Sequence, residues 1–151
     1  MTSLIRSTAD DTAFKTLISQ LDYDLLQRYG PKQSQYDLHN TGLQEARVVL
    51  AFNGNEPVGC ACYKIAEPAG SVEIKRMYVQ PAYRRFGVAQ QLLAQLEAWA
   101  KEEGHHMAVL QTAIKQPEAI ALYQRCGYKS IPCYGVYVGD DDSVCMGKDL
   151  A

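Results

Sequence analysis

Two arginines and a glycine stand together at the start of a leucine-rich segment, VQPAYRRFGVAQQLL, at residues 79–93. A helix start leaves about four backbone N–H groups unpaired and carries about half a positive charge. Gly87 removes a side chain where a ligand would approach the backbone, and Ala89 is nearly as small. The guanidinium groups of Arg84 and Arg85 match phosphate oxygens in shape and charge. The pattern predicts a pyrophosphate site at a strand–loop–helix junction.

Three other interpretations of this loop are a simple glycine bend, a Walker loop and a dinucleotide fingerprint. A glycine bend beside two solvated arginines remains open, because a single glycine is a weak signal. A Walker loop needs Gly-x-x-x-x-Gly-Lys-Ser/Thr and a dinucleotide fingerprint needs three glycines, and the spacing around Gly87 matches neither. The phosphate groups expected here therefore belong to another kind of ligand.

Hydrophobic periodicity predicts the elements that hold this loop. Residues 71–79 alternate as a strand does until Pro81, and residues 88–100 carry the apolar stripe of a helix that Gly104 caps. The other predicted elements are strands at 3–6, 47–52, 58–65, 107–113, 128–131 and 143–150, and helices at 14–25 and 117–126. Residues 31–46 show no clear period and are assigned to a loop with room for a short helix. A strand–helix–strand unit at 71–113 implies parallel pairing and the Asn-Gly hairpin antiparallel pairing, so we expect an α/β fold with a mixed sheet.

Length and composition limit the classes of protein. The chain of 151 residues fits one domain, residues 1–151, and 47% of it is apolar. Its formal net charge of -2 gives no overall basic field for nucleic acid or for an acidic membrane. The acidic start and the lack of an apolar run near ~20 residues predict a cytoplasmic protein without a membrane span. The five cysteines lack metal-site spacing, so we expect free thiols and no metal.

A resemblance to a known family adds to these expectations. Arg84-x-x-Gly87-x-Ala89, preceded by MYVQPAYR and followed by a leucine-rich helix, resembles the acetyl-CoA signature of the GNAT superfamily of N-acetyltransferases. AIALYQRCGY at 119–128 resembles the second marker of that superfamily, and the order of elements matches across the chain. The resemblance implies a single-domain GNAT-like fold with a mostly antiparallel mixed sheet, one parallel splayed strand pair and flanking helices.

The resemblance also implies where coenzyme A binds. The coenzyme would lie between strands 71–79 and 107–113, with its pantetheine arm on backbone groups of the first strand and its pyrophosphate on amides of residues 85–90. Gln116 stands where many members have an asparagine. A contact of this residue with the pantetheine arm or the nearby backbone would therefore have to be made by the longer glutamine side chain. The residues implied to bind the coenzyme are Met77, Tyr78, Val79, Arg84, Arg85, Phe86, Gly87, Val88, Ala89, Gln90, Gln116 and Tyr123.

Acetyl transfer from a thioester to an amine needs a base, a donor to the developing oxyanion and an acid for the thiolate. Glu73 resembles the strand glutamate that some members use as base, directly or through water; pairing with Lys75 or Arg76 is the alternative. The Met77 N–H would serve as the oxyanion donor. Tyr123 would be the acid, although a helix tyrosine is more often core. Cys126 has no evident base partner, so direct attack in a ternary complex is favoured over a covalent intermediate.

The acceptor is left open by the sequence. Its site in this superfamily is built from the first helix pair and the loop between the last strands. Asp22, Asp24 and Asp140 to Asp142 could attract a cationic amine, and Tyr134 and Tyr137 could line its pocket; solvated loop charges and turn tyrosines are the alternative. Both a small-molecule amine and a peptide amine are compatible with the sequence as acceptors. The oligomeric state is also open, and a homodimer is one possibility. The main alternative to an enzyme is a non-catalytic acyl-CoA-binding sensor, which the presence of Glu73 and Tyr123 disfavours. A plain nucleotide-binding domain would need a richer glycine loop.

Overall fold

The computed structural model describes residues 2–29 and 43–150. These residues divide into two compact units, Met1–Lys64 with Lys75–Leu96 and Ile65–Ile74 with Glu97–Ala151. Most of the stretch expected to be a loop, residues 31–46, lies outside the described residues, and its last part forms the short 3-10 helix η2 (Leu43–Glu45).

Among the described residues, three α-helices and seven strands form the regular structure, and the expected α/β class with a mixed sheet is confirmed. The order of hydrogen-bonded strands is β1-β2-β3-β4-β5-β7-β6. The helices are α1 (Thr12–Tyr29), α3 (Val88–Glu102) and α4 (Pro117–Arg125). The strands are β1 (Thr2–Ser7), β2 (Arg47–Asn53), β3 (Glu56–Ala66), β4 (Ser71–Val79), β5 (Met107–Ala113), β6 (Lys129–Ser130) and β7 (Ser143–Asp149), with 3-10 helices η3 (Pro81–Tyr83) and η4 (Gly135–Tyr137). No described helix is long and apolar enough to cross a membrane.

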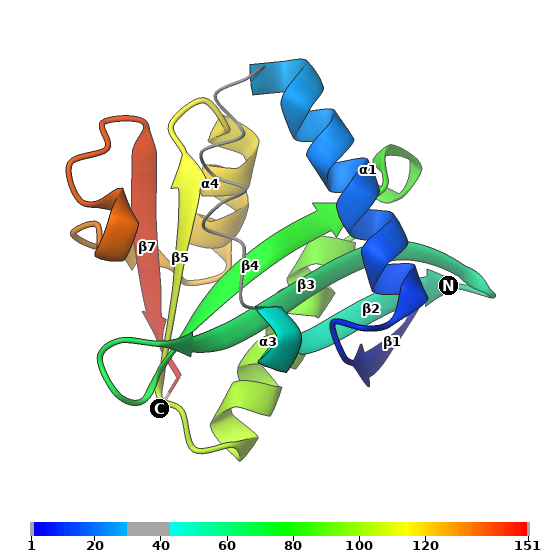
Figure 1. Cartoon of the computed structure of the whole chain (residues 1–151), viewed down its shortest axis with the longest axis horizontal. Coiled ribbons are helices and arrows are strands. Elements are labelled where there is room, and N and C mark those ends of the chain that lie inside the picture. Colours follow the sequence, from blue (N-terminus) through cyan, green and yellow to red (C-terminus); the bar gives the residue numbers. More distant parts are fainter. Residues whose placement is uncertain (1, 30–42, 151) are drawn as a thin grey trace. The chain divides into compact units, whose positions relative to one another are not determined.

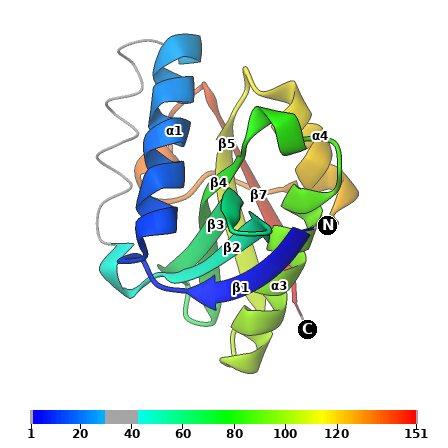
Figure 2. The same ribbon diagram turned by 90° about the vertical axis from the view of Figure 1, so that its right-hand side faces the viewer.

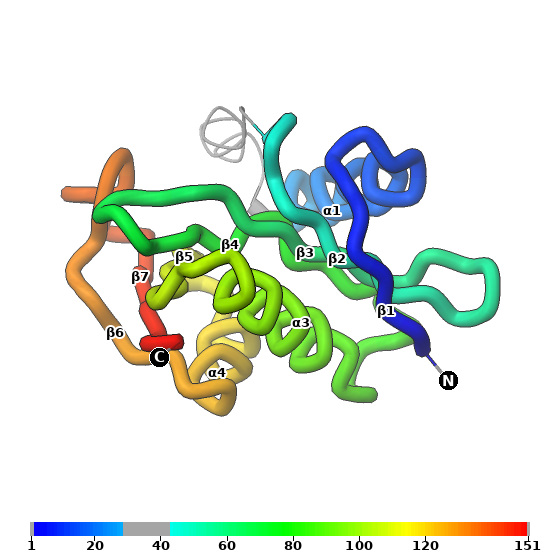
Figure 3. The backbone as a smooth tube through the Cα atoms, turned by 90° about the horizontal axis from the view of Figure 1, so that it is seen from below, coloured from blue at the N-terminus to red at the C-terminus, as the bar shows by residue number. Residues whose placement is uncertain are grey.

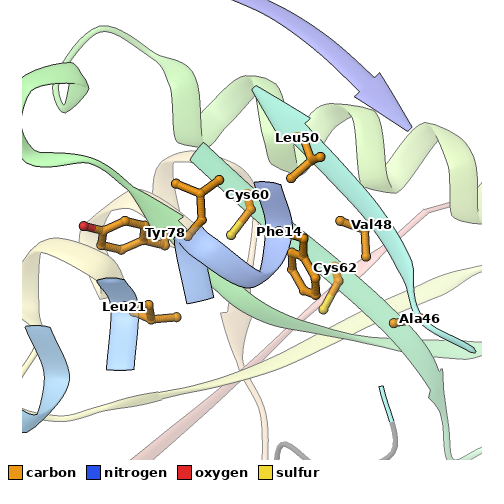
Figure 4. Close-up of a cluster of buried hydrophobic side chains, with 9 residues drawn as sticks. Phe14, Leu21, Ala46, Val48, Leu50, Cys60, Cys62 and Tyr78 are labelled. Atoms are coloured by element: carbon orange, nitrogen blue, oxygen red, sulfur yellow. The ribbon is translucent and has the colours of Figure 1, made fainter. Parts of the chain in front are cut away.

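In the first unit, α1 packs on one face of β2 and β3. Period-2 alternation puts Cys60 and Cys62 on the same face of β3, where both side chains are buried and form no disulfide with a described residue. Figure 4 shows these thiols beside Phe14 of α1 and the side chains of β2 and β4. The buried members of this core are Phe14, Leu17, Leu21, Ala46, Val48, Leu50, Cys60, Cys62 and Tyr78. The apolar stripe of α1 is therefore satisfied by the sheet, as its spacing predicts.

The opposite face of the first unit is covered by the start of α3 (Figures 2 and 3). A Cβ added at Gly59 would lie 3.2 Å from Val88 Cγ1, 3.3 Å from Leu92 Cδ1 and 3.2 Å from the Tyr78 carbonyl oxygen. These separations are tighter than most Cβ contacts, so a side chain here would push its neighbours apart, and glycine lets α3 approach the strand closely. The N-terminal turn of α3 is thereby fixed against β3.

The second unit joins the start of β4 to the C-terminal strands. Ser71–Ile74 pairs in parallel with Met107–Leu110, which confirms the parallel pair expected from the strand–helix–strand pattern. β5 pairs antiparallel with β7 along its whole length, and Figure 1 shows the two strands side by side. Around α4, the buried Tyr128 donates a 2.9 Å hydrogen bond to Glu97, which also accepts one of 2.8 Å from Lys148. This network ties the end of α4 to β7 and to the last turns of α3.

Candidate functional site

The loop between β4 and α3 leads into a helix start at which several backbone N–H groups have no helical acceptor. Arg85 and Gly87 both adopt left-handed conformations, with φ of 72° and 80°. The first helical hydrogen bond runs from the Gln91 N–H to the Gly87 carbonyl oxygen at 3.1 Å. The amides of Val88, Ala89 and Gln90 precede that bond and have no helical acceptor. The junction predicted from the sequence is therefore present, with its N–H groups at the start of a fifteen-residue helix.

Gly87 is required by its backbone conformation and leaves open space beside it. A left-handed φ is costly for residues with a Cβ. The nearest atom to a Cβ built at Gly87 is Gln90 Oε1 at 3.7 Å, so the protein itself does not fill this position. The first turn of α3 contains no acidic residue that would compete for its N-terminal charge. These features fit a pyrophosphate group.

The side chains around these amides differ in exposure. Arg85, Phe86 and Gln90 are exposed, with Phe86 at 76%, whereas Val88 is buried. Arg84 is turned back toward β4: its Nε donates to the Val79 carbonyl oxygen at 2.8 Å and its guanidinium lies 5.7 Å from the centre of the Tyr78 ring. One donor of Arg84 is thus used to fix the loop, and Arg85 is the arginine whose side chain is open to solvent.

The end of β4 carries the backbone expected to meet the pantetheine arm. Met77 is half-buried and Tyr78 and Val79 are buried. Just before them, Arg76 has a left-handed φ of 58° inside the strand. A non-glycine residue in this region is uncommon and distorts the regular pleat. β4 is therefore irregular immediately before the Met77 amide.

Glu73 lies in the second unit and has a specific partner there. Its side chain is buried, and its Oε2 accepts a 3.0 Å hydrogen bond from the hydroxyl of Tyr134. Burial, followed by the nearby carboxylate, raises the pKa of Tyr134 well above its ordinary value, so the phenol stays a donor. Arg76, one of the alternative partners considered for Glu73, instead pairs with Asp22 at 2.7 Å.

Tyr123 and Gln116, also in the second unit, lie at the two ends of α4. Tyr123 is buried and its ring packs edge-on against Tyr128, with ring centres 6.0 Å apart. Within the described residues its hydroxyl has no hydrogen-bond partner, and burial, followed by Cys126, raises its pKa to about 12. Gln116 precedes the helix but its side chain makes no capping hydrogen bond. The Tyr123 ring therefore packs on Tyr128, and the Gln116 amide does not cap α4.

The carboxylates considered for attracting an amine are engaged in the structure. Asp22 pairs with Arg76 at 2.7 Å, and Asp24 lies 3.5 Å from Arg28 and 3.9 Å from Arg84. Asp140 caps its own turn, accepting hydrogen bonds from the Asp142 N–H and the Ser143 hydroxyl. Asp22 and Asp24 therefore face arginines, whereas the Asp140 carboxylate is bound by neutral donors of its own turn.

Sequence reasoning missed the Glu73–Tyr134 and Asp22–Arg76 pairs. Their members are 61 and 54 residues apart along the chain. Neither pair has a local spacing signal such as the i, i+4 rule for helices. Only the strand pairing and the packing of α1 bring these side chains together.

Comparison with known proteins agrees with this fold. The acetyltransferase (GNAT) family profile matches residues 14–128. The "IAA acetyltransferase" of Azospirillum brasilense is 31% identical over 150 residues, which are 98% of this chain and 97% of that protein. A Klebsiella pneumoniae crystal structure, provisionally named acyl-CoA N-acyltransferase, is 33% identical with a TM-score of 0.83 over 100% of this chain and 99% of that one. The Thermoplasma acidophilum PaiA N-acetyltransferase in complex with coenzyme A, 16% identical over 99% of both chains, shares the fold with a TM-score of 0.75. The chain is therefore an acetyltransferase and belongs to the GNAT family.

Proposed function

We propose that the protein transfers an acetyl group from acetyl-CoA to a primary amine by direct attack within a ternary complex. The observation that carries this proposal is the donor-rich junction at the start of α3, with left-handed Arg85 and Gly87. In a chain of this family, the anion expected at such a junction is the pyrophosphate of coenzyme A. The Thermoplasma structure, which holds coenzyme A on the same fold, supports the choice of coenzyme.

The residues of the junction would hold the coenzyme by their backbone. The amides from Arg85 to Gln90 would donate to phosphate oxygens, Arg85 would add charge from solvent, and Arg84 would keep the loop in place through Val79. The backbone of Met77, Tyr78 and Val79 would pair with the pantetheine arm. Phe86 has an exposed apolar ring in the same loop. The side-chain amide of Gln116 makes no capping hydrogen bond, so it would be available as a further donor.

The chemistry assigns three tasks to this chain's own residues. Bound acetyl-CoA supplies an activated acyl group. Glu73 accepts the proton that the acceptor amine must lose, and its burial strengthens that interaction. The Met77 N–H donates to the acyl oxygen as negative charge develops. Tyr123 gives its proton to the leaving sulfur; with a pKa raised to about 12 it is protonated at neutral pH.

The acceptor is proposed only as a primary amine, on a small molecule or a peptide. Asp22 and Asp24 already face arginines, so they give no separate reason to expect a polycationic acceptor. We propose that residues 1–151 act as one acetyltransferase domain, because the Azospirillum relative aligns over 98% of the chain. A cytoplasmic location stays a prediction.

The proposal is tested by incubating the purified protein with acetyl-CoA and a panel of amines while following release of free thiol. We expect thiol release that depends on both the amine and the protein, with an acetylated amine of the corresponding mass. Coenzyme A binding is measured in parallel by thermal shift. A protein that binds coenzyme A but releases no thiol with any amine class would be a binding domain, contrary to the proposal.

A further inference from the structure

The hydroxyl of Tyr134 and the carboxylate of Glu73 form a direct pair inside the second unit. The hydroxyl lies 3.0 Å from Glu73 Oε2, and Glu73 is only 6% exposed. A charged acceptor at this distance makes a stronger hydrogen bond than a neutral one. Tyr134 is half-buried, so water competes little for this bond.

Tyr134 is held in place by its own loop. Its carbonyl oxygen accepts a 3.0 Å hydrogen bond from the Tyr137 N–H, and the Tyr137 ring packs edge-on at a centre distance of 5.7 Å. Three residues earlier, the Ile131 N–H donates to the Cys145 carbonyl oxygen of β7 at 3.0 Å. The loop is thereby fixed to β7 and to η4. A donor mounted in this way restricts the orientation of the carboxylate that it binds.

The electrostatic surroundings keep the phenol in its donor form. The titratable groups that face Tyr134 are Glu73 of β4, Cys145 of β7 and Tyr137 of η4. The thiol of Cys145 in turn faces Cys133 and Glu73, and burial, followed by Cys133, raises its pKa. Burial and the nearby carboxylate keep the pKa of Tyr134 raised, so its hydroxyl remains a donor to Glu73.

We propose that Tyr134 is a positioning residue for acetyl transfer, which holds the Glu73 carboxylate in a fixed orientation to receive the proton of the acceptor amine. The inference rests on the proposed role of Glu73 as base. Tyr134 itself neither gains nor loses a proton: the amine proton goes to Glu73 and the phenol hydrogen stays on oxygen. A hydrogen bond to a carboxylate favours the charged form over the protonated one, so removal of the bond is expected to show in the pH dependence of turnover.

The test is the pH dependence of turnover in Tyr134→Phe, which removes one oxygen and keeps the ring. We expect the acidic limb of the kcat/KM profile to move to higher pH, and the plateau to fall by about threefold to thirtyfold. The KM for acetyl-CoA should stay unchanged. An acidic limb at the wild-type position in a folded Tyr134→Phe protein would overturn the inference.

A matched control is Tyr128→Phe. Tyr128 also donates to a glutamate, Glu97, at 2.9 Å, within the same unit, and it has no proposed part in the reaction. We expect this variant to lower the melting temperature and to leave the pH profile unchanged. An equal shift of the acidic limb in both variants would show a general structural effect and would contradict the inference.

The inference and the proposed function can fail separately. Glu73→Gln alone tests the base: wild-type turnover in this variant would refute the role of Glu73 and with it the inference. If Glu73→Gln is impaired, Tyr134→Phe in that background should change turnover no further, because the two residues act through one group. A further loss of similar size would overturn the inference and leave Glu73 as base.

A second substitution keeps the inference testable if Tyr134→Phe does not fold. Incorporation of 3-fluorotyrosine in place of Tyr134 keeps the ring and the hydroxyl and makes the phenol a stronger donor. The acidic limb should then move to lower pH, opposite to the change in Tyr134→Phe. Movement to higher pH, or none, would count against a hydrogen bond that acts on Glu73.

Discussion

The guanidinium of Arg76 donates a 2.7 Å hydrogen bond from Nη2 to the Asp22 carboxylate and so links the middle of β4 to α1. The Arg76 side chain is 6% exposed and Asp22 is 41% exposed. Within the described residues the Arg76 Nε is buried without a hydrogen-bond partner, and the backbone has a left-handed φ of 58°. Such conformations cost about 1–3 kcal/mol and cluster at functional sites. The strain lies next to Met77, whose amide is the proposed oxyanion donor.

Asp22→Asn should therefore destabilise the protein. The amide keeps the shape but leaves the buried guanidinium without a counter-charge. Breaking a fully buried pair costs about 3–5 kcal/mol, and the exposure of Asp22 reduces this to an expected loss of about 1–2 kcal/mol. Asp24→Asn on the same helix is the control, with an expected loss below about 1 kcal/mol, because its arginine partners are more exposed. Urea denaturation measures both, and equal losses would show that the Arg76 pair has no special weight.

Gly87 should tolerate bulk better than negative charge. Gly87→Glu and Gly87→Gln have the same size and the same left-handed strain, and they differ in charge. Saturating coenzyme A, at ~100 times its Kd, should stabilise the wild type by about 2.7 kcal/mol. We expect a weaker but measurable thermal shift in Gly87→Gln and none in Gly87→Glu at the same concentration. Wild-type shifts in both folded variants would place the pyrophosphate elsewhere.

The sequence predicted the local elements of the site well because their signals are local. β4 and β5 have the bounds that alternation predicts, and the left-handed Gly87 stands where a glycine turn was expected. The contacts of Glu73 and Asp22 were not predicted, because they depend on which distant segments pack together. The conformation of Arg76 was also missed: the run SVEIKRMYV has strong strand propensity, and arginine gives no sign of a left-handed φ.

Glu73→Gln should lower turnover most below neutral pH. The glutamine cannot take the amine proton, so the reaction depends on the acceptor that is already deprotonated in solution. That fraction falls about tenfold per pH unit below the pKa of an alkyl amine near 10. We expect losses of about 10²–10⁴-fold in kcat with nearly unchanged acetyl-CoA affinity. Glu56→Gln in β3, where the carboxylate accepts a 3.4 Å contact from Tyr83, is the matched control. A proportional loss at every pH would argue against a base.

Stability should fall at alkaline pH because of buried phenols and thiols. Burial raises the pKa of Tyr123 to about 12 from 10.0 and raises that of Cys60 as well. The folded protein thus keeps these protons to higher pH than the unfolded chain. The contribution of Tyr123 is complete below its unfolded pKa and is lost between pH 10 and 12. Tyr123→Phe should reduce this fall by about 2 kcal/mol at pH 11.5, since the whole shift from 10.0 to about 12 corresponds to about 2.7 kcal/mol. Urea denaturation from pH 8 to 11.5 measures the slope, with the half-buried Tyr83→Phe as control. An unchanged slope in Tyr123→Phe would contradict the assignment.

Tyr123→Phe should lower turnover at neutral pH without a comparable loss of stability. The ring keeps its edge-on contact with Tyr128, and the hydroxyl that is removed has no hydrogen-bond partner among the described residues. If that hydroxyl protonates the leaving sulfur, its contact strengthens only in the transition state, so kcat falls while acetyl-CoA binding barely changes. A coenzyme A thiolate is already a fair leaving group, and we expect kcat to fall by about tenfold to a hundredfold, near the low end for general acids.

Tyr128→Phe should have the opposite effect: the free energy of unfolding should fall by about 1–2 kcal/mol with the loss of the bond to Glu97, and turnover should be kept. Melting temperature and turnover measured on the same preparations separate the two residues. Wild-type turnover in Tyr123→Phe would return Tyr123 to the core and leave the thiolate to depart unassisted.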